Sequence, residues 1–222
     1  MEEITPELLL RAYACGFFPM ADSAESEELY WYDPPWRGII PLEHFHVPRK
    51  LRRVVRQKRF EVRFDSDFST VLEACAEPTD ERPKTWINDG IRRLYGGLAE
   101  TGYAHSVECW RDGALIGGLY GVSLRGAFFG ESMFSRQADA SKVALVHLVA
   151  QLQACGFLLL DTQFMTDHLR QFGGIEISQA AYKKRLALAL RVPAKFEPDP
   201  QALGRLLDAG EAAGEVAPPR AS

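Results

Sequence analysis

Hydrophobic and polar residues repeat with two different periods along the chain, and together these periods predict an α+β fold. Leu51, Val54 and Val55 have the i, i+3, i+4 spacing of one helix face. Residues 157–164 begin as an unbroken apolar run, which is typical of a strand buried on both faces. Helices are predicted over residues 6–15, 66–77, 89–100, 142–154 and about 200–208, with another starting at Ser178; strands are predicted over 61–64, 103–111, 114–123, 126–133 and 157–164, with short extended pieces at 37–42 and 44–47.

Cap and turn residues mark several of these boundaries. Thr5 and Asn88 are polar residues of the kind that cap helix N-termini, and Asp139 or Ser141 is expected to cap the long helix that follows them. The pair Asp112-Gly113 favours a two-residue hairpin turn between two of the predicted strands.

The order of the elements divides the chain into three predicted parts. Residues 1–60 are expected to form a small N-terminal domain, or a lid on the next domain. Residues 61–192 contain antiparallel strands, then a helix, then a buried strand, an order compatible with an N-acetyltransferase-like (GNAT-like) fold. Residues 193–222 are rich in Ala, Gly and Pro, so we expect a short helix and a disordered end there.

Composition favours a cytoplasmic enzyme. The 222 residues carry a formal net charge of −4, so any nucleic-acid binding must come from a local basic patch. No apolar run reaches membrane-spanning length, and the N-terminus does not have the pattern of a secretory signal. The four cysteines and the histidines show no metal-ligand spacing, so we assign no metal and interpret the cysteines as reduced core thiols.

One local basic patch is present. Residues 49–60 read RKLRRVVRQKRF, with seven basic side chains and no acidic one. The segment is either an ordinary solvated helix face or a contact for nucleic-acid phosphates. Residues 1–30 carry one Arg against seven acids, and this asymmetry of charge favours the phosphate contact.

Glu131 is an acidic residue in an otherwise apolar predicted strand. Because a buried charge needs a partner, it is either a functional group or half of an ion pair with a nearby arginine such as Arg136 or Arg125.

Asp161 and Gln163 end the buried strand, two residues apart and therefore on the same face. The end of a buried strand is a common place for active-site groups. The alternative is that Asp161 caps a turn while Gln163 is solvated.

Glycines interrupt the predicted strand 114–123 at Gly117, Gly118 and Gly121, which indicates a bulge or the close approach of a ligand. Acetyltransferases hold the pyrophosphate of coenzyme A with a glycine-containing loop before their long helix. Residues 135–140 occupy the corresponding place and contain no glycine, which argues against coenzyme A, and we expect no cofactor.

Several segments taken together resemble the leucyl/phenylalanyl-tRNA–protein transferase family, in an order that covers roughly residues 5–185. The segments are Tyr13-Ala14-Cys15-Gly16-Phe17-Phe18-Pro19, Thr85-Trp86-Ile87, Gly102-Tyr103-Ala104-His105-Ser106-Val107-Glu108, Gly117-Gly118-Leu119-Tyr120-Gly121-Val122, Gly130-Glu131-Ser132-Met133-Phe134-Ser135-Arg136 with Ala140-Ser141-Lys142, Asp161-Thr162-Gln163, His168-Leu169 to Gly173, and Ile175-Glu176-Ile177.

The resemblance implies a small N-terminal domain on an acetyltransferase-like domain. It also implies transfer of Leu or Phe, less readily Met, from aminoacyl-tRNA to proteins that begin with Arg or Lys, which creates a bacterial degradation signal. By resemblance, Asp161 and Gln163 orient the attacking amine and help to remove its proton, and Glu131 with Asp161 favours a cationic acceptor. We expect a monomer that does not contact membranes.

The resemblance also implies two binding regions. The apolar aminoacyl side chain is expected in a pocket formed by Trp86, Leu119, Met133, Leu145 and Leu160. The acceptor-stem phosphates of the tRNA are expected to contact the basic segment, through Arg49, Lys50, Arg52, Arg53, Arg56, Lys58 and Arg59.

Some positions depart from the family pattern. Met20 stands where many relatives have Trp, and Thr166-Asp167-His168 replaces a more usual Asn before the His. Two other readings stay open from the residues themselves. One is an acyl-CoA N-acyltransferase of the same fold, and the other is an RNA-binding module without catalysis.

Overall fold

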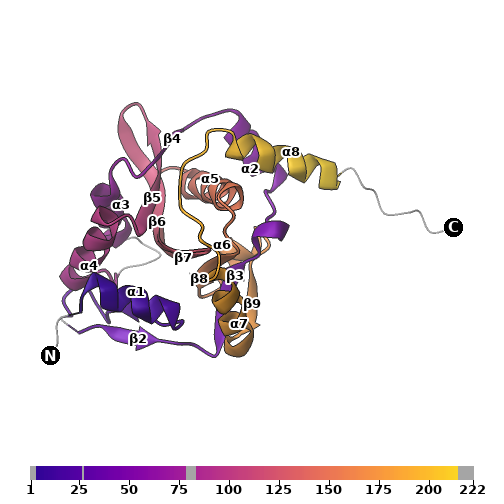
Figure 1. Ribbon diagram of the computed structural model, residues 1–222. Helices are drawn as coiled ribbons and strands as arrows, with labels where there is room; N and C mark the ends of the chain where they lie inside the picture. Colours follow the sequence, from indigo (N-terminus) through magenta and orange to yellow (C-terminus); the bar gives the residue numbers. More distant parts are fainter. Residues whose placement is uncertain (1–3, 27, 79–83, 215–222) are drawn as a thin grey trace.

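A seven-stranded mixed sheet with helices on both faces forms the centre of the computed structural model, which describes residues 4–26, 28–78 and 84–214 (Figure 1). Within these residues, only the β7–β8 pair is parallel. In spatial order the strands are β4 (Glu61–Phe64), β5 (Ala104–Arg111), β6 (Ala114–Leu124), β7 (Ala127–Ser135), β8 (Leu159–Gln163), β3 (Trp36–Ile40) and β9 (Ile175–Ser178). A separate ribbon pairs β1 (Phe18–Met20) with β2 (Tyr30–Tyr32).

Successive residues of the central strands supply two separate cores, because side chains alternate between the faces of a sheet. Phe128 and Leu160 belong to the core beside α5, while Phe129 and Leu159 belong to the opposite core. The first core is covered by α2 (Arg49–Arg56), α5 (Ala140–Ala154), α6 (Asp167–Arg170) and α8 (Ala202–Gly214), and the second by α1 (Pro6–Ala14), α3 (Phe68–Ala76), α4 (Asp89–Glu100) and α7 (Gln179–Ala189).

The predicted boundaries agree with this arrangement where local signals are strong. The side chains of Thr5, Asn88 and Ser178 each accept a hydrogen bond from a backbone N–H of the helix that follows. Asp112 and Gly113 both have positive φ, of 52° and 76°, as a tight hairpin turn requires. Asp139 precedes α5 in a left-handed conformation, but its carboxylate pairs with Lys142 and forms no cap hydrogen bond.

Other predictions need correction. The segment 44–47 was predicted to be a short extended piece, but His44 ends a 3-10 helix, Leu42–His44, and residues 45–47 belong to no strand, although the backbone of Phe45 is extended. The short elements β1, β2, β9 and α6 were not predicted, because each spans only three or four residues and has no clear period. Cys15 is exposed rather than buried in a core, whereas Cys75 and Cys109 are buried as expected.

The N-terminal sixty residues are joined to the rest through the sheet itself. Strand β3 lies between β8 and β9, so part of this segment is inside the central sheet. Helix α2 packs against α5 through Leu51, Val54 and Val55, the three residues predicted to form its apolar face. No helix in the described ranges is long and apolar enough to cross a membrane.

Candidate active site

Glu131 is placed by an irregularity in the sheet. The pairing of β6 with β7 shifts between Tyr120, which lies opposite Ser132, and Gly121, which lies opposite Gly130, so Glu131 has no partner across the ladder. Such a β-bulge changes the direction in which a side chain points. A Cβ on Gly121 would lie 2.3 Å from the carbonyl oxygen of Phe129, so the bulge requires glycine here. The bulge predicted from the strand glycines is therefore present.

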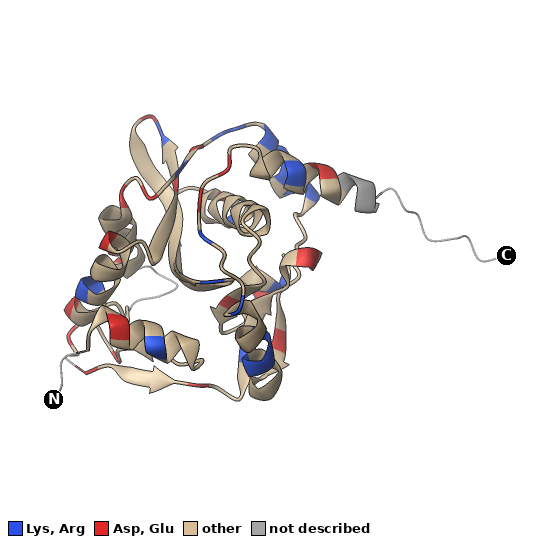
Figure 2. Ribbon diagram, in the orientation of Figure 1, with Lys and Arg blue, Asp and Glu red and all other residues tan. Residues whose placement is uncertain are grey.

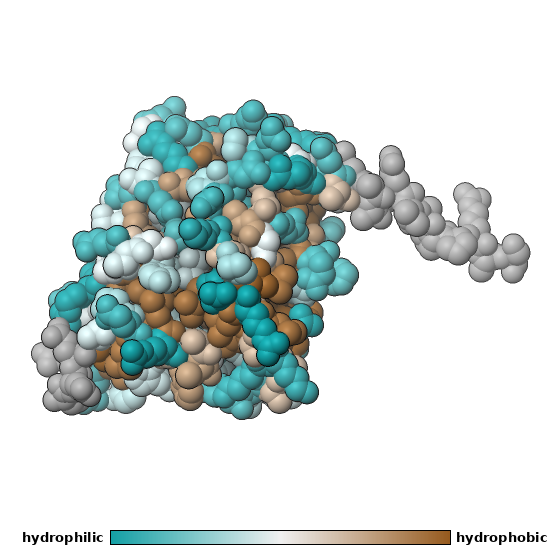
Figure 3. All heavy atoms as spheres, viewed as in Figure 1, coloured by the Kyte–Doolittle hydropathy of each residue, from teal (hydrophilic) through white to brown (hydrophobic). Residues whose placement is uncertain are grey.

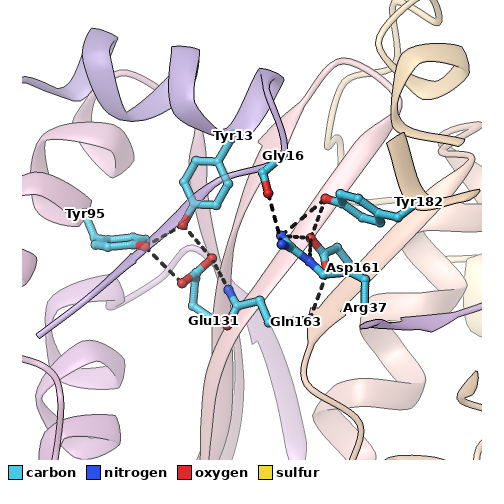
Figure 4. Close-up of polar contacts among 8 residues, drawn as sticks. All are labelled: Tyr13, Gly16, Arg37, Tyr95, Glu131, Asp161, Gln163 and Tyr182. Carbon is cyan, nitrogen blue, oxygen red and sulfur yellow. Dashed lines mark hydrogen bonds and ion pairs between the residues drawn. The ribbon is translucent and has the colours of Figure 1, made fainter. Parts of the chain in front are cut away.

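Three neutral side chains donate hydrogen bonds to the Glu131 carboxylate (Figure 4). Tyr13 Oη of α1 lies 2.6 Å from Oε1, Tyr95 Oη of α4 lies 2.9 Å from Oε2, and Gln163 Nε2 lies 2.9 Å from Oε1. The two tyrosine hydroxyls also contact each other. The ion pair considered for Glu131 is absent from this arrangement, since Arg136 pairs with Glu77 and Arg125 donates to the carbonyl of Arg191.

The surroundings of Glu131 make its charged form costly. Burial raises the pKa of Glu131 to about 7, although the hydrogen bonds from Tyr13, Tyr95 and Gln163 act in the opposite direction. Burial, and then the neighbouring Glu131, raise the pKa of both Tyr13 and Tyr95 well above the ordinary value. Both tyrosines therefore stay protonated and act as donors, while Glu131 titrates near neutral pH.

A second bulge lies beside Asp161. Gly38 pairs with Gln163 and Ile39 pairs with Asp161, so Thr162 is left without a partner. Gln163 itself has a φ of 62°, which is uncommon for a residue other than glycine. A Cβ on Gly38 would lie 2.8 Å from the backbone carbon of Phe164, so glycine is needed where β8 ends.

Asp161 has a fixed cationic partner, in contrast to Glu131. The guanidinium of Arg37 contacts both carboxylate oxygens, with Nε 3.0 Å from Oδ1 and Nη2 2.6 Å from Oδ2. Tyr182 Oη donates to Oδ2 at 2.7 Å. Burial, and then the Asp161 charge, raise the pKa of Tyr182 well above its ordinary value, so this hydroxyl stays a donor.

Gln163 connects the two carboxylates. Its backbone N–H donates to Asp161 Oδ1 at 2.8 Å, while its side-chain amide donates to Glu131. Asp161 thus accepts a bond within a turn, but Gln163 is buried rather than solvated. The three predicted catalytic residues lie together. Figure 4 shows Glu131 and Gln163 in one group with the two tyrosines, and Asp161 in the neighbouring group with Arg37.

A pocket of about 910 Å³ opens beside Glu131 and Gln163, which both line it. All five residues predicted for the aminoacyl pocket line it as well: Trp86 before α4, Leu119 of β6, Met133 of β7, Leu145 of α5 and Leu160 of β8. Met20, one of the departures from the family pattern, is also part of its wall. The site therefore combines a chamber that has apolar residues on part of its wall with a carboxylate whose pKa is raised to about 7.

The predicted phosphate-binding residues lie elsewhere on the surface. In Figure 2 the blue ribbon segments that mark Lys and Arg are gathered over α2 and the start of α8. Arg52 is half-buried, and the other six predicted residues, Arg49, Lys50, Arg53, Arg56, Lys58 and Arg59, are exposed. Helix α5 packs against α2 and also supplies Leu145 to the pocket, so one helix joins the two regions.

Comparisons with known proteins identify the family of the chain. A family model described as leucyl/phenylalanyl-tRNA protein transferase matches residues 39–187, and the model of the N-terminal domain of the same family matches residues 2–35. The chain belongs to the leucyl/phenylalanyl-tRNA–protein transferase family. The predicted family is confirmed, and with it the prediction of a transferase.

Curated members of the transferase family cover most of the chain. The protein of that name from Paramagnetospirillum magneticum is 61% identical over 197 residues, which are 89% of this chain and 94% of the relative. The one from Nitrobacter winogradskyi is 59% identical over 194 residues, 87% of this chain and 86% of the relative. Among solved structures, a functionally unknown conserved protein from Staphylococcus epidermidis matches with a TM-score of 0.40 and 11% identity, covering 80% of this chain and 66% of the other.

Four residues around the three predicted catalytic residues were not themselves predicted as site residues: Tyr13, Arg37, Tyr95 and Tyr182. Tyr13 lies in one of the segments that resemble the transferase family, but no role was assigned to it. Arg37 precedes Gly38, Ile39 and Ile40, and a lone arginine in an apolar strand is a signal that a buried acid lies opposite. Tyr95 and Tyr182 carry no comparable signal, because tyrosines on the inner faces of helices are common core residues.

Proposed function

We propose that the chain transfers Leu or Phe, and Met less readily, from aminoacyl-tRNA to the α-amine of proteins that begin with Arg or Lys, creating a degradation signal. Membership of the transferase family carries this proposal. The site supports it because a pocket with apolar residues in its wall and a partly buried carboxylate lie side by side, as an apolar donor and a cationic acceptor require.

The proposed step exchanges an ester for an amide. The acceptor α-amine attacks the ester carbonyl carbon, the C–N bond forms, the bond to the tRNA ribose oxygen breaks, and the amine proton is passed to that leaving oxygen. Because the ester is already activated, orientation of the amine and modest help with its proton are sufficient. The Gln163 side-chain oxygen is the acceptor that we assign to this amine, and Asp161 holds Gln163 in place.

The acceptor's side chain is assigned to Glu131 alone. Both Asp161 oxygens already contact Arg37, so Asp161 has little capacity to attract a second cation. Glu131 has only neutral donors in the described structure, and an arriving guanidinium or ammonium would compensate its charge. The donor's aminoacyl side chain would occupy the chamber lined by Trp86, Leu119, Met133, Leu145 and Leu160.

The tRNA backbone is assigned to α2 and the residues after it. The first turn of α2 contains Arg49 and Lys50 and no acidic residue, which is unfavourable next to the positive end of a helix. An anionic partner would compensate that local cost. Contacts with phosphates carry no base sequence information, so this surface suits several tRNAs.

The remaining parts of the proposal concern architecture and setting. We assign residues 61–192 to a GNAT-like catalytic domain and residues 1–60 to a small N-terminal domain whose strand β3 completes the catalytic sheet. The C-terminal segment 193–222 contains α8, and the disordered end predicted after this helix lies outside the described residues. The chemistry requires no cofactor or metal. The transferase would act as a monomer in the cytoplasm.

Transfer of radiolabelled Leu and Phe from charged tRNA to matched peptides tests the reaction. Peptides that begin with Arg and Lys should be labelled, and otherwise identical peptides that begin with Asp or Ala should not. Labelling of the Asp peptide would contradict the assigned acceptor preference. Absence of any labelling by folded protein would favour an RNA-binding or acyl-CoA function instead.

The tRNA surface is tested by a fourfold variant in which Arg49, Arg53, Arg56 and Arg59 are replaced by Ala. Its affinity for tRNA should fall, and the dependence of that affinity on salt should flatten. The matched control replaces Lys184 and Arg185, which are exposed on α7, by Ala and should bind as the wild type does. An unchanged salt dependence in the fourfold variant would remove α2 from the interface.

A further inference from the structure

Arg37 is a buried cation that has no role in the reaction proposed above. Its side chain is 1% exposed, and it lies on β3 beside the apolar residues Ile39 and Ile40. An arginine at such a position is costly unless every part of its guanidinium has a partner.

The guanidinium joins three segments that are distant in sequence. Nη1 donates to the carbonyl oxygen of Gly16 at 3.0 Å, directly after α1, while Nε and Nη2 reach Asp161 of β8. Nη2 also lies 3.3 Å from Tyr182 Oη of α7. The rings of Phe18 and Tyr182 each lie 4.5 Å from the central carbon of the guanidinium. Arg37 thus has polar partners in one plane and rings packed against that plane, which a flexible ammonium does not reproduce.

Asp161 connects Arg37 to the pocket residue Gln163. Its Oδ1 accepts both from Arg37 Nε, at 3.0 Å, and from the backbone N–H of Gln163, at 2.8 Å. Gln163 has the uncommon φ of 62°, so its backbone needs such support. Its side-chain amide then lies 2.9 Å from Glu131 Oε1. A change in the orientation of the Asp161 carboxylate would therefore displace the amide of Gln163.

We propose that Arg37, supported by Tyr182, is a positioning residue for aminoacyl transfer, which acts through Asp161 to hold the Gln163 amide against Glu131. The inference rests on the proposed function, since Gln163 is there the group that meets the acceptor amine. Arg37 itself touches neither substrate. Its contribution belongs to the rate of the chemical step rather than to binding of tRNA or acceptor.

A purely structural role for Arg37 would have a different signature. Loss of such a role would lower stability and the amount of folded protein, while the folded fraction would keep its turnover number. A positioning role lowers kcat in folded protein and leaves KM nearly unchanged, because positioning acts on the reacting geometry.

The first test compares Arg37→Lys with wild type in steady-state transfer from Phe-tRNA to an Arg peptide. Lys keeps the charge but loses the planar fork, so kcat should fall about 10- to 100-fold, with KM for both substrates within about twofold. The matched control is Arg63→Lys, because Arg63 also makes a two-pronged pair, with Glu61 on the surface, at 2.8 and 3.0 Å. The control should turn over as the wild type does.

Tyr182→Phe keeps the inference testable if Arg37→Lys does not fold. It removes one donor to Asp161 Oδ2 and retains the ring against Arg37, so kcat should fall about three- to tenfold with unchanged KM. If each of these two variants that folds has the wild-type kcat, the positioning role is overturned and the proposed function is not. An inactive wild-type protein would overturn the proposed function, and this inference with it.

Discussion

The site contains two carboxylates that are positioned in the same way, by β-bulges, but that have opposite kinds of partner. Glu131 and Asp161 each lie at or beside a β-bulge that requires a glycine on the neighbouring strand. Asp161 meets a guanidinium that contacts both of its oxygens, whereas Glu131 meets two phenols and an amide. The Asp161 charge is compensated by Arg37, whereas Glu131 has neutral hydrogen-bond donors within the described residues. The comparison therefore separates a carboxylate with an ionic partner from one that we propose receives its cationic partner from the acceptor.

The helices that contribute to the two groups are surrounded by apolar surface. Figure 3 shows apolar surface gathered between α1 and α7, the helices that supply Tyr13 and Tyr182. A charged group left uncompensated in apolar surroundings is expensive for the folded state, and the raised pKa of Glu131 expresses that cost. The five predictions that follow test the comparison, beginning with the largest expected effect.

Asp161→Asn should produce the greatest loss of stability. It leaves the buried Arg37 without its ionic partner, so the free energy of unfolding should fall by about 3–5 kcal/mol, and transfer should be lost. Urea unfolding at pH 7 measures the first effect. A variant within about 1 kcal/mol of wild type would show that the Arg37–Asp161 pair does not hold the fold.

Glu131→Gln should separate function from stability. The isosteric amide keeps a hydrogen-bonding group beside Tyr13 and Tyr95 but cannot compensate a cationic acceptor. Transfer to an Arg peptide should fall about 100-fold, the size expected when one partner of a buried charge pair is removed. Competition of unlabelled Arg and Ala peptides gives the matching binding measurement. Equal activity of variant and wild type on the Arg peptide would remove Glu131 from acceptor recognition.

The ratio of wild-type to Glu131→Gln transfer activity should change with pH because Glu131 titrates. The acceptor amine loses its proton over a similar range in both proteins, so the quotient of wild-type and Glu131→Gln activity isolates the carboxylate. Because Glu131 has a pKa of about 7, the quotient should fall roughly fivefold between pH 7 and pH 6. A quotient that stays constant from pH 6 to pH 8 would contradict titration of Glu131 in this range.

The free energy of unfolding should also change with pH, in the direction set by the raised pKa of Glu131. The folded-state pKa of Glu131 lies above its unfolded value, so the folded protein binds the extra proton between about pH 4.5 and pH 7. Protonated Glu131 therefore favours the folded state at low pH. This contribution to the free energy of unfolding is lost as pH rises through about 7. Glu131→Gln should be more stable than wild type at pH 8, and the difference should shrink at pH 5. Thermal unfolding at both values checks the sign.

Gln163→Gly and Gln163→Ala should show the smallest effect on stability. Both remove the amide that links the two carboxylates, so both should lose transfer. At a φ of 62°, Gly is favoured over Ala by about 1 kcal/mol, so the glycine variant should be the more stable of the two. Equal stability would indicate that the backbone relaxes when the side chain is removed.

Much of the candidate site could be predicted from the sequence, because most of its residues lie in or beside segments that resemble the transferase family. Glu131, Asp161 and Gln163 lie together, and the five predicted pocket residues line one chamber. Their roles stay predictions until the variants are measured. The partners of the trio could not be predicted in the same way. Tyr13 meets Glu131 across 118 positions, and Arg37 meets Asp161 across 124.

The sequence by itself determined the elements whose signals are local. Helix periodicity, polar caps and the Asp112-Gly113 turn decided where most helices and the main hairpin begin and end, because these effects act within a few residues. The strand glycines indicated the bulge beside Glu131, but the tertiary structure alone decided the bulge beside Asp161, the insertion of β3 between β8 and β9, and the pairing of Asp161 rather than Glu131 with Arg37. A period shows which face of a strand is buried, whereas register and ionic partners depend on which distant segments share that face.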